Sequence, residues 1–237
     1  MPPPQTNATP GSTPPPVPPD PAAPETRNIA ATLLKNPLRI SGLIAGQRNL
    51  LRASLALLLV ALACHVVFGL AVGLFGGWTV AAMDMAKVPL VALCSLLLCF
   101  PSLYVFTCVA GAPLSLAQTF VLGCSCFAMV GLILVGLAPV AWLFAVSTES
   151  LSFVAMLAFL IWLVAVGFAS RYVDKLGVHP LFQRRAGIKL WFLILMLVTL
   201  QMATCMRPML SKPEPGWWTG EKKFFLSHFA DTLNDKK

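Results

Sequence analysis

Residues 114–146 read LSLAQTFVLGCSCFAMVGLILVGLAPVAWLFAV, a block of 33 residues without a charged side chain. A helix needs only about 20 apolar residues to cross a bilayer. Pro139 divides the block, but each of two spans made from it would be too short. We therefore expect one long helix that is tilted or kinked in the membrane.

Similar apolar blocks lie on both sides of this one, separated by glycine pairs, prolines and charged residues. The pattern predicts an all-α fold, a polytopic transmembrane helix bundle with amphipathic surface helices at both ends. We expect the transmembrane domain at 53–206. Its five spans are placed at about 53–75, 88–109, 114–146, 151–170 and 188–206.

The composition places the whole chain in the membrane class. Of its 237 residues, 57% are hydrophobic and 11% are charged, whereas a soluble domain carries roughly 25% charged residues. The net charge of +8 does not indicate nucleic-acid binding, because the basic residues lie beside apolar blocks. The positive-inside rule and contact with anionic lipid headgroups explain them there.

The two ends of the chain differ from the spans. Residues 1–25 form a proline-rich tail that we expect to be disordered. Residues 26–52 alternate apolar and basic side chains, which suits a juxtamembrane segment on an anionic leaflet. The tail 207–237 holds a predicted amphipathic helix whose aromatic residues contact the membrane or a partner protein: Trp217, Trp218, Phe224, Phe225 and Phe229.

Charge placement predicts the orientation. With five spans, the basic stretch before the first span and the basic loop before the fifth lie on one side, which should be cytoplasmic. The N-terminus is then cytoplasmic and the C-terminus outside, most simply in a bacterial inner membrane. The residues expected at lipid headgroups are Arg39, Arg48, Arg52, Arg171, Arg184 and Arg185.

Few side chains in the spans could perform chemistry. His65 is the one ionisable residue well inside an expected span, while Asp84 and Lys87 fall at expected membrane edges. A lone histidine is more often a packing residue than a haem or pigment ligand. Cys124 and Cys126 point about 200° apart on a helix, so they would not share a metal. We expect no catalytic residue, no cofactor and no metal site, and hence no enzyme.

Small and neutral polar residues indicate helix packing instead. Gly69, Gly73 and Gly77 repeat every four residues, a spacing that lets two helices approach closely. Gln118, Gln201 and Thr107, together with several serines, are expected to hydrogen-bond across helices. The expected partners are therefore membrane lipids and other membrane proteins.

The order of these parts resembles the Yip family of five-span membrane proteins, including its bacterial branch. The likeness covers about residues 28–208. It rests on Asn36-Pro37, on Pro101 to Tyr104, on Ser115 to Gln118 and on the ending Gln201-Met202 to Arg207-Pro208. The acidic DLYGP-type motif of eukaryotic members is absent. The resemblance implies five spans and a non-enzymatic membrane role, and it carries no site residue over.

Three functions fit the sequence. The favoured one is a structural or accessory subunit that docks on a larger membrane complex, because buried charge is scarce and both ends carry amphipathic segments. A Yip-like membrane-organising protein is the second. A transporter or channel for a neutral solute is the third, and it would need helices broken by glycine or proline around a polar cavity.

Overall fold

The computed structural model describes residues 29–35, 37–45, 49–109, 111, 114–176 and 186–205. Every regular element in these ranges is a helix, which confirms the all-α prediction. The elements are α1 (Ile29–Lys35), α2 (Pro37–Ala45), α3 (Leu50–Gly73), the short 3₁₀ helix η2 (Leu74–Gly76), α4 (Trp78–Val109), α5 (Leu116–Ser147), α6 (Leu151–Leu176) and α7 (Ala186–Cys205).

Four helical segments are long and apolar enough to cross a membrane. They are Leu50–Gly76, Trp78–Val109, Leu116–Ser147 and Leu151–Leu176. The fifth expected span is also helical, as α7, but its apolar stretch Lys189–Ala203 is shorter. At 1.5 Å per residue those 15 residues cover about 22 Å, less than the roughly 30 Å of a bilayer core.

The long block that decides the fold is one continuous helix, as expected. α5 runs from Leu116 to Ser147 with Pro139 inside it. A proline in a helix removes one backbone hydrogen bond without ending the helix when the flanking turns are well packed. Ala138 and Ala141, on either side of the proline, are both buried. Packing on the bundle therefore holds α5 together through Pro139.

The second expected span is longer than the sequence suggested. It was placed at 88–109, but α4 begins at Trp78 and includes Asp84, Lys87 and Pro89. Gly77 sets this start, because its φ of 89° turns the chain in a conformation that glycine adopts without strain. Asp84 does not stop the helix, since it turns toward α3 and is only 2% exposed. The charges that marked a boundary in the sequence lie inside the helix.

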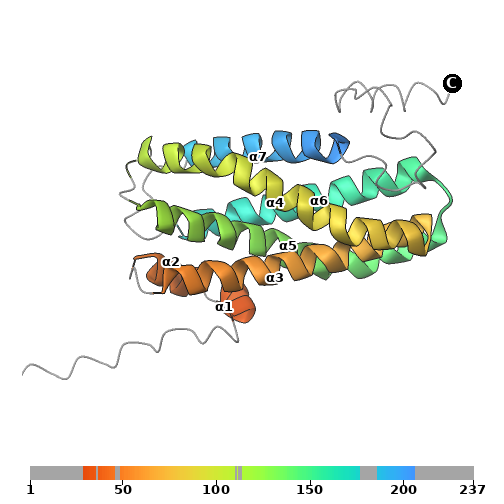
Figure 1. Ribbon diagram of the computed structural model, residues 1–237, viewed down its shortest axis with the longest axis horizontal. Helices are drawn as coiled ribbons and strands as arrows, with labels where there is room; N and C mark the ends of the chain where they lie inside the picture. Colours follow the sequence, from red (N-terminus) through yellow and green to blue (C-terminus); the bar gives the residue numbers. More distant parts are fainter. Residues whose placement is uncertain are drawn as a thin grey trace, which may run out of the picture.

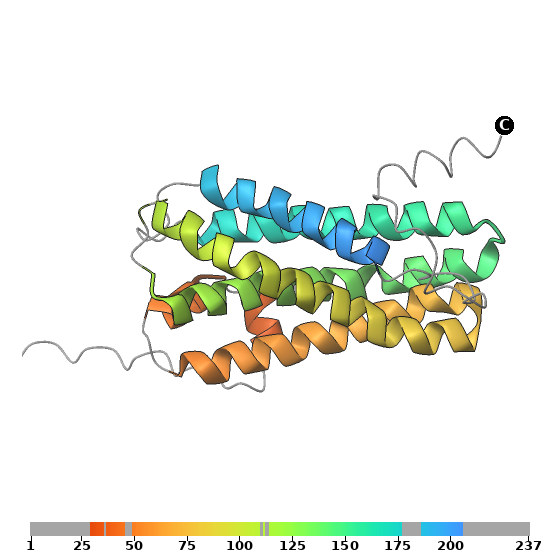
Figure 2. The ribbon, with the colours of Figure 1, turned by 45° about the horizontal axis from the view of Figure 1, so that its top comes forward.

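The five long helices run along the long axis of the bundle, with α5 at its centre (Figure 1). α5 packs against α3, α4 and α6, and α7 packs mainly against α4. Seen after a 45° turn, α4 lies between α3 and α7 (Figure 2). α5 has neighbours on most sides, and many of its buried residues are small, among them Gly123, Ala128 and Gly131.

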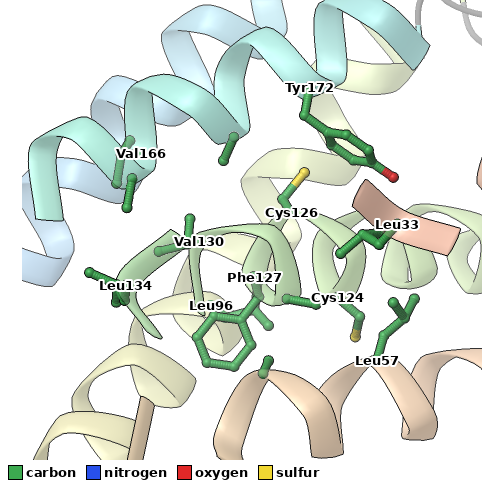
Figure 3. Close-up of a cluster of buried hydrophobic side chains, with 14 of the residues drawn as sticks. Leu33, Leu57, Leu96, Cys124, Cys126, Phe127, Val130, Leu134, Val166 and Tyr172 are labelled. Atoms are coloured by element: carbon green, nitrogen blue, oxygen red, sulfur yellow. The ribbon is translucent and has the colours of Figure 1, made fainter. Parts of the chain in front are cut away.

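The two short helices cover the remaining side of α5 at one end of the bundle. α1 buries Ile29 and Leu33, and α2 buries Ile40 and Ile44. In Figure 3, Leu33 lies between Tyr172 of α6 and Leu57 of α3. The apolar side of the segment expected on the leaflet surface therefore faces the protein. Its basic side chains Lys35 and Arg39 remain exposed.

Charged side chains divide between the two ends of the bundle. The end that carries α1, α2 and the starts of α3 and α7 holds one acidic residue, Asp174, and a group of basic residues, namely Lys35, Arg39, Arg52, Arg171, Lys175 and Lys189. Among the described residues the opposite end holds Asp84, Lys87 and Glu149. Among the described residues, most basic side chains therefore gather at one end of the bundle.

Candidate functional site

His65 lies at the centre of the bundle, on the side of α3 that faces α5. It is 2% exposed, and its ring stacks on Phe127 with the ring centroids 4.5 Å apart and the planes 25° apart. Its Nδ1 is 2.8 Å from the carbonyl oxygen of Ala61, one turn earlier. A carbonyl oxygen only accepts, so Nδ1 carries the proton, and Nε2 of the neutral ring is an acceptor.

Gly131 makes room for this histidine. A Cβ at position 131 would lie 3.0 Å from Cβ of Cys64 and 3.1 Å from Nδ1 of His65. It would also lie 3.2 Å from the Ala61 carbonyl oxygen, so α5 approaches the backbone of α3 here. The sequence did not indicate this contact, because Gly131 has no glycine partner four residues away. The signal it did offer was the run of small residues on α5.

All five long helices contribute side chains to a small cavity beside His65. Its volume is about 30 Å³, and its lining is mostly apolar. A polar cavity of this size holds about one water molecule, which needs two or more polar partners. The polar lining comprises His65, Cys126 and Thr199, and the Thr199 hydroxyl already donates to the Leu195 carbonyl oxygen at 2.7 Å. The aromatic part of the lining comprises Phe127, Trp162, Trp191 and Phe192.

Trp191 fastens α7 to α4 next to this cavity. Its side chain is fully buried, and its indole Nε1 donates to the Cys99 carbonyl oxygen at 2.9 Å. In a helix interior that carbonyl also accepts a bond from the backbone of residue 103. An indole ring supplies a large apolar contact together with one directed hydrogen bond. The sequence gave no reason to single out this tryptophan from the other five.

Gln118 joins α5 to α2. Its backbone N–H donates to the Ser115 hydroxyl at 3.3 Å, while its Oε1 accepts from the Ser115 N–H at 2.8 Å. These two bonds form a capping box at the start of α5. Its Nε2 donates to the Ile44 carbonyl oxygen at 2.6 Å. The expectation that Gln118 bonds across helices is confirmed.

The other neutral polar residues bond within their own helices. Thr107 donates to the Tyr104 carbonyl oxygen, Ser95 to that of Val91, and Ser125 to that of Leu122. Serine and threonine reach the carbonyl three or four residues back, which satisfies the hydroxyl locally. The expectation of bonds across helices is therefore wrong for Thr107 and for Ser95.

The glycine repeat divides between two roles. Gly69 and Gly73 lie against the backbone of α4, as the packing interpretation requires. A Cβ at Gly69 would be 2.5 Å from the Asp84 carbonyl oxygen, and one at Gly73 would be 2.7 Å from Cα of Ala81. Gly77 has no atom within 4 Å of its Cβ position and a φ of 89°. It shapes the turn into α4 and does not pack helices.

Asp84, which the sequence placed at an expected membrane edge, is buried between two helices. It is 2% exposed and lies between α4 and the end of α3. Its Oδ1 has no hydrogen-bond partner among the described residues. Lys87, one turn further along α4, acts on it electrostatically. Buried carboxylates in membrane helices are costly and mark functional sites by default.

The cysteines do not gather. Figure 3 shows Cys124 pointing toward α3 and Cys126 toward α6, so the two thiols diverge as expected. Within the described ranges, no three His, Cys, Asp or Glu side chains are grouped so that they could hold a metal ion. The expected headgroup residues Arg48, Arg184 and Arg185 lie outside those ranges. So do Trp217, Trp218, Phe224, Phe225 and Phe229.

The chain matches no family model, no curated protein and no solved structure. Its function must therefore be inferred from its own residues.

Proposed function

We propose that this protein is a non-enzymatic integral membrane protein that serves as a structural or accessory subunit of a larger membrane complex. The observation that carries the proposal is the contrast between the tightly packed interior of the bundle and its exposed apolar faces. Where the five long helices meet, the side chains leave a cavity of about 30 Å³. The outer faces of the same helices are long and apolar.

The cavity is too small for a metabolite. Pockets that bind small molecules measure roughly 300 to 1,000 Å³, at least ten times the volume of about 30 Å³ found here. An enzyme or a carrier of neutral solutes would need such a space in at least one of its states. The packed interior therefore favours a function in which the bundle itself is recognised by another protein.

The outer face of α3 illustrates what a partner would meet. Leu51, Leu55, Leu59 and Val67 lie on one side of the helix and are between 46% and 73% exposed. In a bilayer such a face contacts either lipid or another helix. Lipid tails are as apolar as leucine, so hydrophobicity does not favour one contact over the other, and close packing determines whether a helix binds there. Faces of this kind are suited to docking within the membrane plane.

The tail beyond span five supplies the second docking element of the proposal. Trp217 and Trp218 precede an amphipathic pattern with Phe224, Phe225 and Phe229. These residues lie outside the described ranges, and their role rests on the sequence pattern. With the N-terminus cytoplasmic, this tail would meet a partner on the outer side of the membrane.

Purification from native membranes in mild detergent tests the proposal. The full-length chain should elute in a large peak with partner proteins at a fixed ratio. A chain that ends at Gly216 should lose those partners. A chain that ends at Leu233 is the matched control, because it keeps all the aromatic residues and should remain bound.

Two results would count against this function. If the full-length chain elutes alone and reshapes lipid vesicles, it is a membrane organiser of the Yip type and not a subunit. If the chain ending at Gly216 keeps its partners at the full ratio, the tail is not the docking element, and the exposed faces of the helices become the place to search.

A further inference from the structure

At the junction of α3 and α4, the buried carboxylate of Asp84 packs against the backbone of α3. Asp84 faces the last two turns of α3, where the residues opposite it, Gly69 and Gly73, have no side chain. A Cβ at Gly73 would lie 3.1 Å from Cβ of Asp84 and 3.2 Å from the Ala81 nitrogen. The absent side chain at Gly73 is what leaves room for the carboxylate.

On the α3 side, the surroundings of this carboxylate provide no charged group to neutralise it. Val66 to Gly73 of α3, together with η2, contain no titratable side chain. α3 ends at Gly73, beside this junction, and the C-terminal end of a helix carries partial negative charge. Lys87 is the charged side chain of α4 that acts on Asp84. His65 lies one turn before Gly69, on the α5 side of α3, stacked on Phe127.

We propose that Asp84 and the C-terminal end of α3 form a binding site for a single positive charge, either a proton or a monovalent metal cation such as Na⁺. One observation and one placement support the site. The Asp84 Oδ1 is buried and has no partner among the described residues. Asp84 also packs against the end of α3, with its Cβ 3.1 Å from the Cβ position of Gly73, and a helix C-terminus presents carbonyl oxygens. A carboxylate with carbonyl oxygens is the ligand set that hard cations prefer.

Binding there would tighten the contact between α3 and α4. A bound positive charge cancels the repulsion between the carboxylate and the end of α3, at the point where the two backbones touch. The site is separate from the proposed docking elements, so its failure would leave the proposed function unaffected.

A hydrophobic carbodiimide tests the site on the full-length protein in detergent. The reagent modifies a carboxylic acid that carries its proton: the O–H adds across a C=N bond, and the acyl group then migrates to nitrogen to give a stable acylurea. Mass spectrometry locates the product by peptide. Labelling of Asp84 is expected, and the Asp84→Asn variant should show none in the same peptide. Glu149 and Asp174 serve as internal references for carboxylates elsewhere.

The two cations give different results. If Na⁺ is the ligand, raising NaCl at fixed pH slows the labelling of Asp84, whereas choline chloride does not. If the ligand is a proton, Na⁺ has no effect, and the rate falls about tenfold per pH unit once the proton is lost. Absence of labelling at every pH, with and without Na⁺, would overturn the site and leave Asp84 as a fixed partner of Lys87.

Thermal unfolding separates binding at Asp84 from an effect of Na⁺ or pH on the carbodiimide reaction itself. The melting temperature of the wild-type chain should change with Na⁺ or with pH, according to the ligand. The Asp84→Asn variant keeps the shape of the side chain, so it should fold and its melting temperature should not respond to that ligand. An equal response in both proteins would overturn the proposal.

Discussion

The Cα of Gly69 faces the main-chain carbonyl oxygen of Asp84, and a Cβ added at Gly69 would lie 2.5 Å from that oxygen. At this crossing the backbones of α3 and α4 therefore touch directly. Such contacts stabilise membrane helices by close packing, since no hydrophobic effect drives helices together in lipid.

Replacing Gly69 by alanine should separate the two helices. The new methyl group must displace backbone, and overpacking of this kind costs about 1–3 kcal/mol. We expect a lower midpoint when the Gly69→Ala protein is unfolded by a denaturing detergent. Gly136 has no neighbour within 4 Å of its Cβ position, so Gly136→Ala is the matched control. It should be neutral or gain up to about 1 kcal/mol. Equal stability of both variants would contradict the backbone contact.

His65 should tolerate replacement by phenylalanine. The Ala61 carbonyl oxygen also accepts the backbone bond of the helix, so removing the ring N–H leaves no buried group without a partner. The aromatic stack on Phe127 persists. The expected loss is about 1 kcal/mol or less, measured by thermal unfolding with an absorbance spectrum of each protein. A visible absorption band that disappears in His65→Phe would instead identify His65 as a ligand of a coloured cofactor.

The sequence was sufficient for the helices and insufficient for their contacts. The length of the block 114–146 decides α5, because so long an apolar stretch has few alternatives in a membrane. The start of α4 was placed ten residues late, because Asp84 and Lys87 mark a boundary only if they face water. Whether they do depends on Gly69 and Gly73 of a different helix. That dependence is a tertiary effect that no local pattern contains.

Only part of the candidate site could be predicted, because most of it also depends on contacts between helices. His65 was singled out as a lone histidine within a span. Gly131 and Trp191 were not, since their roles arise from the crossing of α5 with α3 and of α7 with α4. Asp84 was set aside because its burial could not be seen.

Gln118 performs two tasks that two variants should separate. Ser115→Ala removes the hydroxyl of the capping box and should cost about 1 kcal/mol, while α2 stays in place. Gln118→Glu keeps the oxygen that accepts from Ser115 but puts a second acceptor against the Ile44 carbonyl oxygen. We expect α2 to detach in this variant, seen as faster hydrogen exchange across Pro37–Ala45. Equal exchange in the two variants would show that Gln118 does not hold α2.

Trp191 should limit the access of reagents to the Cys99 thiol of α4. In Trp191→Phe the bond to the Cys99 carbonyl oxygen is lost and α7 loosens, because α7 packs mainly against α4. Cys99, which is 2% exposed, should then react faster with a small maleimide in detergent, as followed by mass spectrometry of its peptide. Trp142 is exposed at the far end of α5, so Trp142→Phe is the control and should leave the Cys99 rate unchanged. An unchanged rate in Trp191→Phe would mean that packing alone holds α7.

The charge asymmetry of the bundle predicts which end faces the cytoplasm. Glu149 lies in the turn between α5 and α6, and Lys175 lies near the end of α6 at the basic end, where Cys108 of α4 is also exposed. In right-side-out membrane vesicles, an impermeant maleimide should label a Glu149→Cys variant and spare a Lys175→Cys variant. Native Cys108 is the internal control, since it should react only after the vesicles are opened. The reverse pattern would place the basic end outside and would overturn the orientation on which the outer position of the C-terminal tail depends.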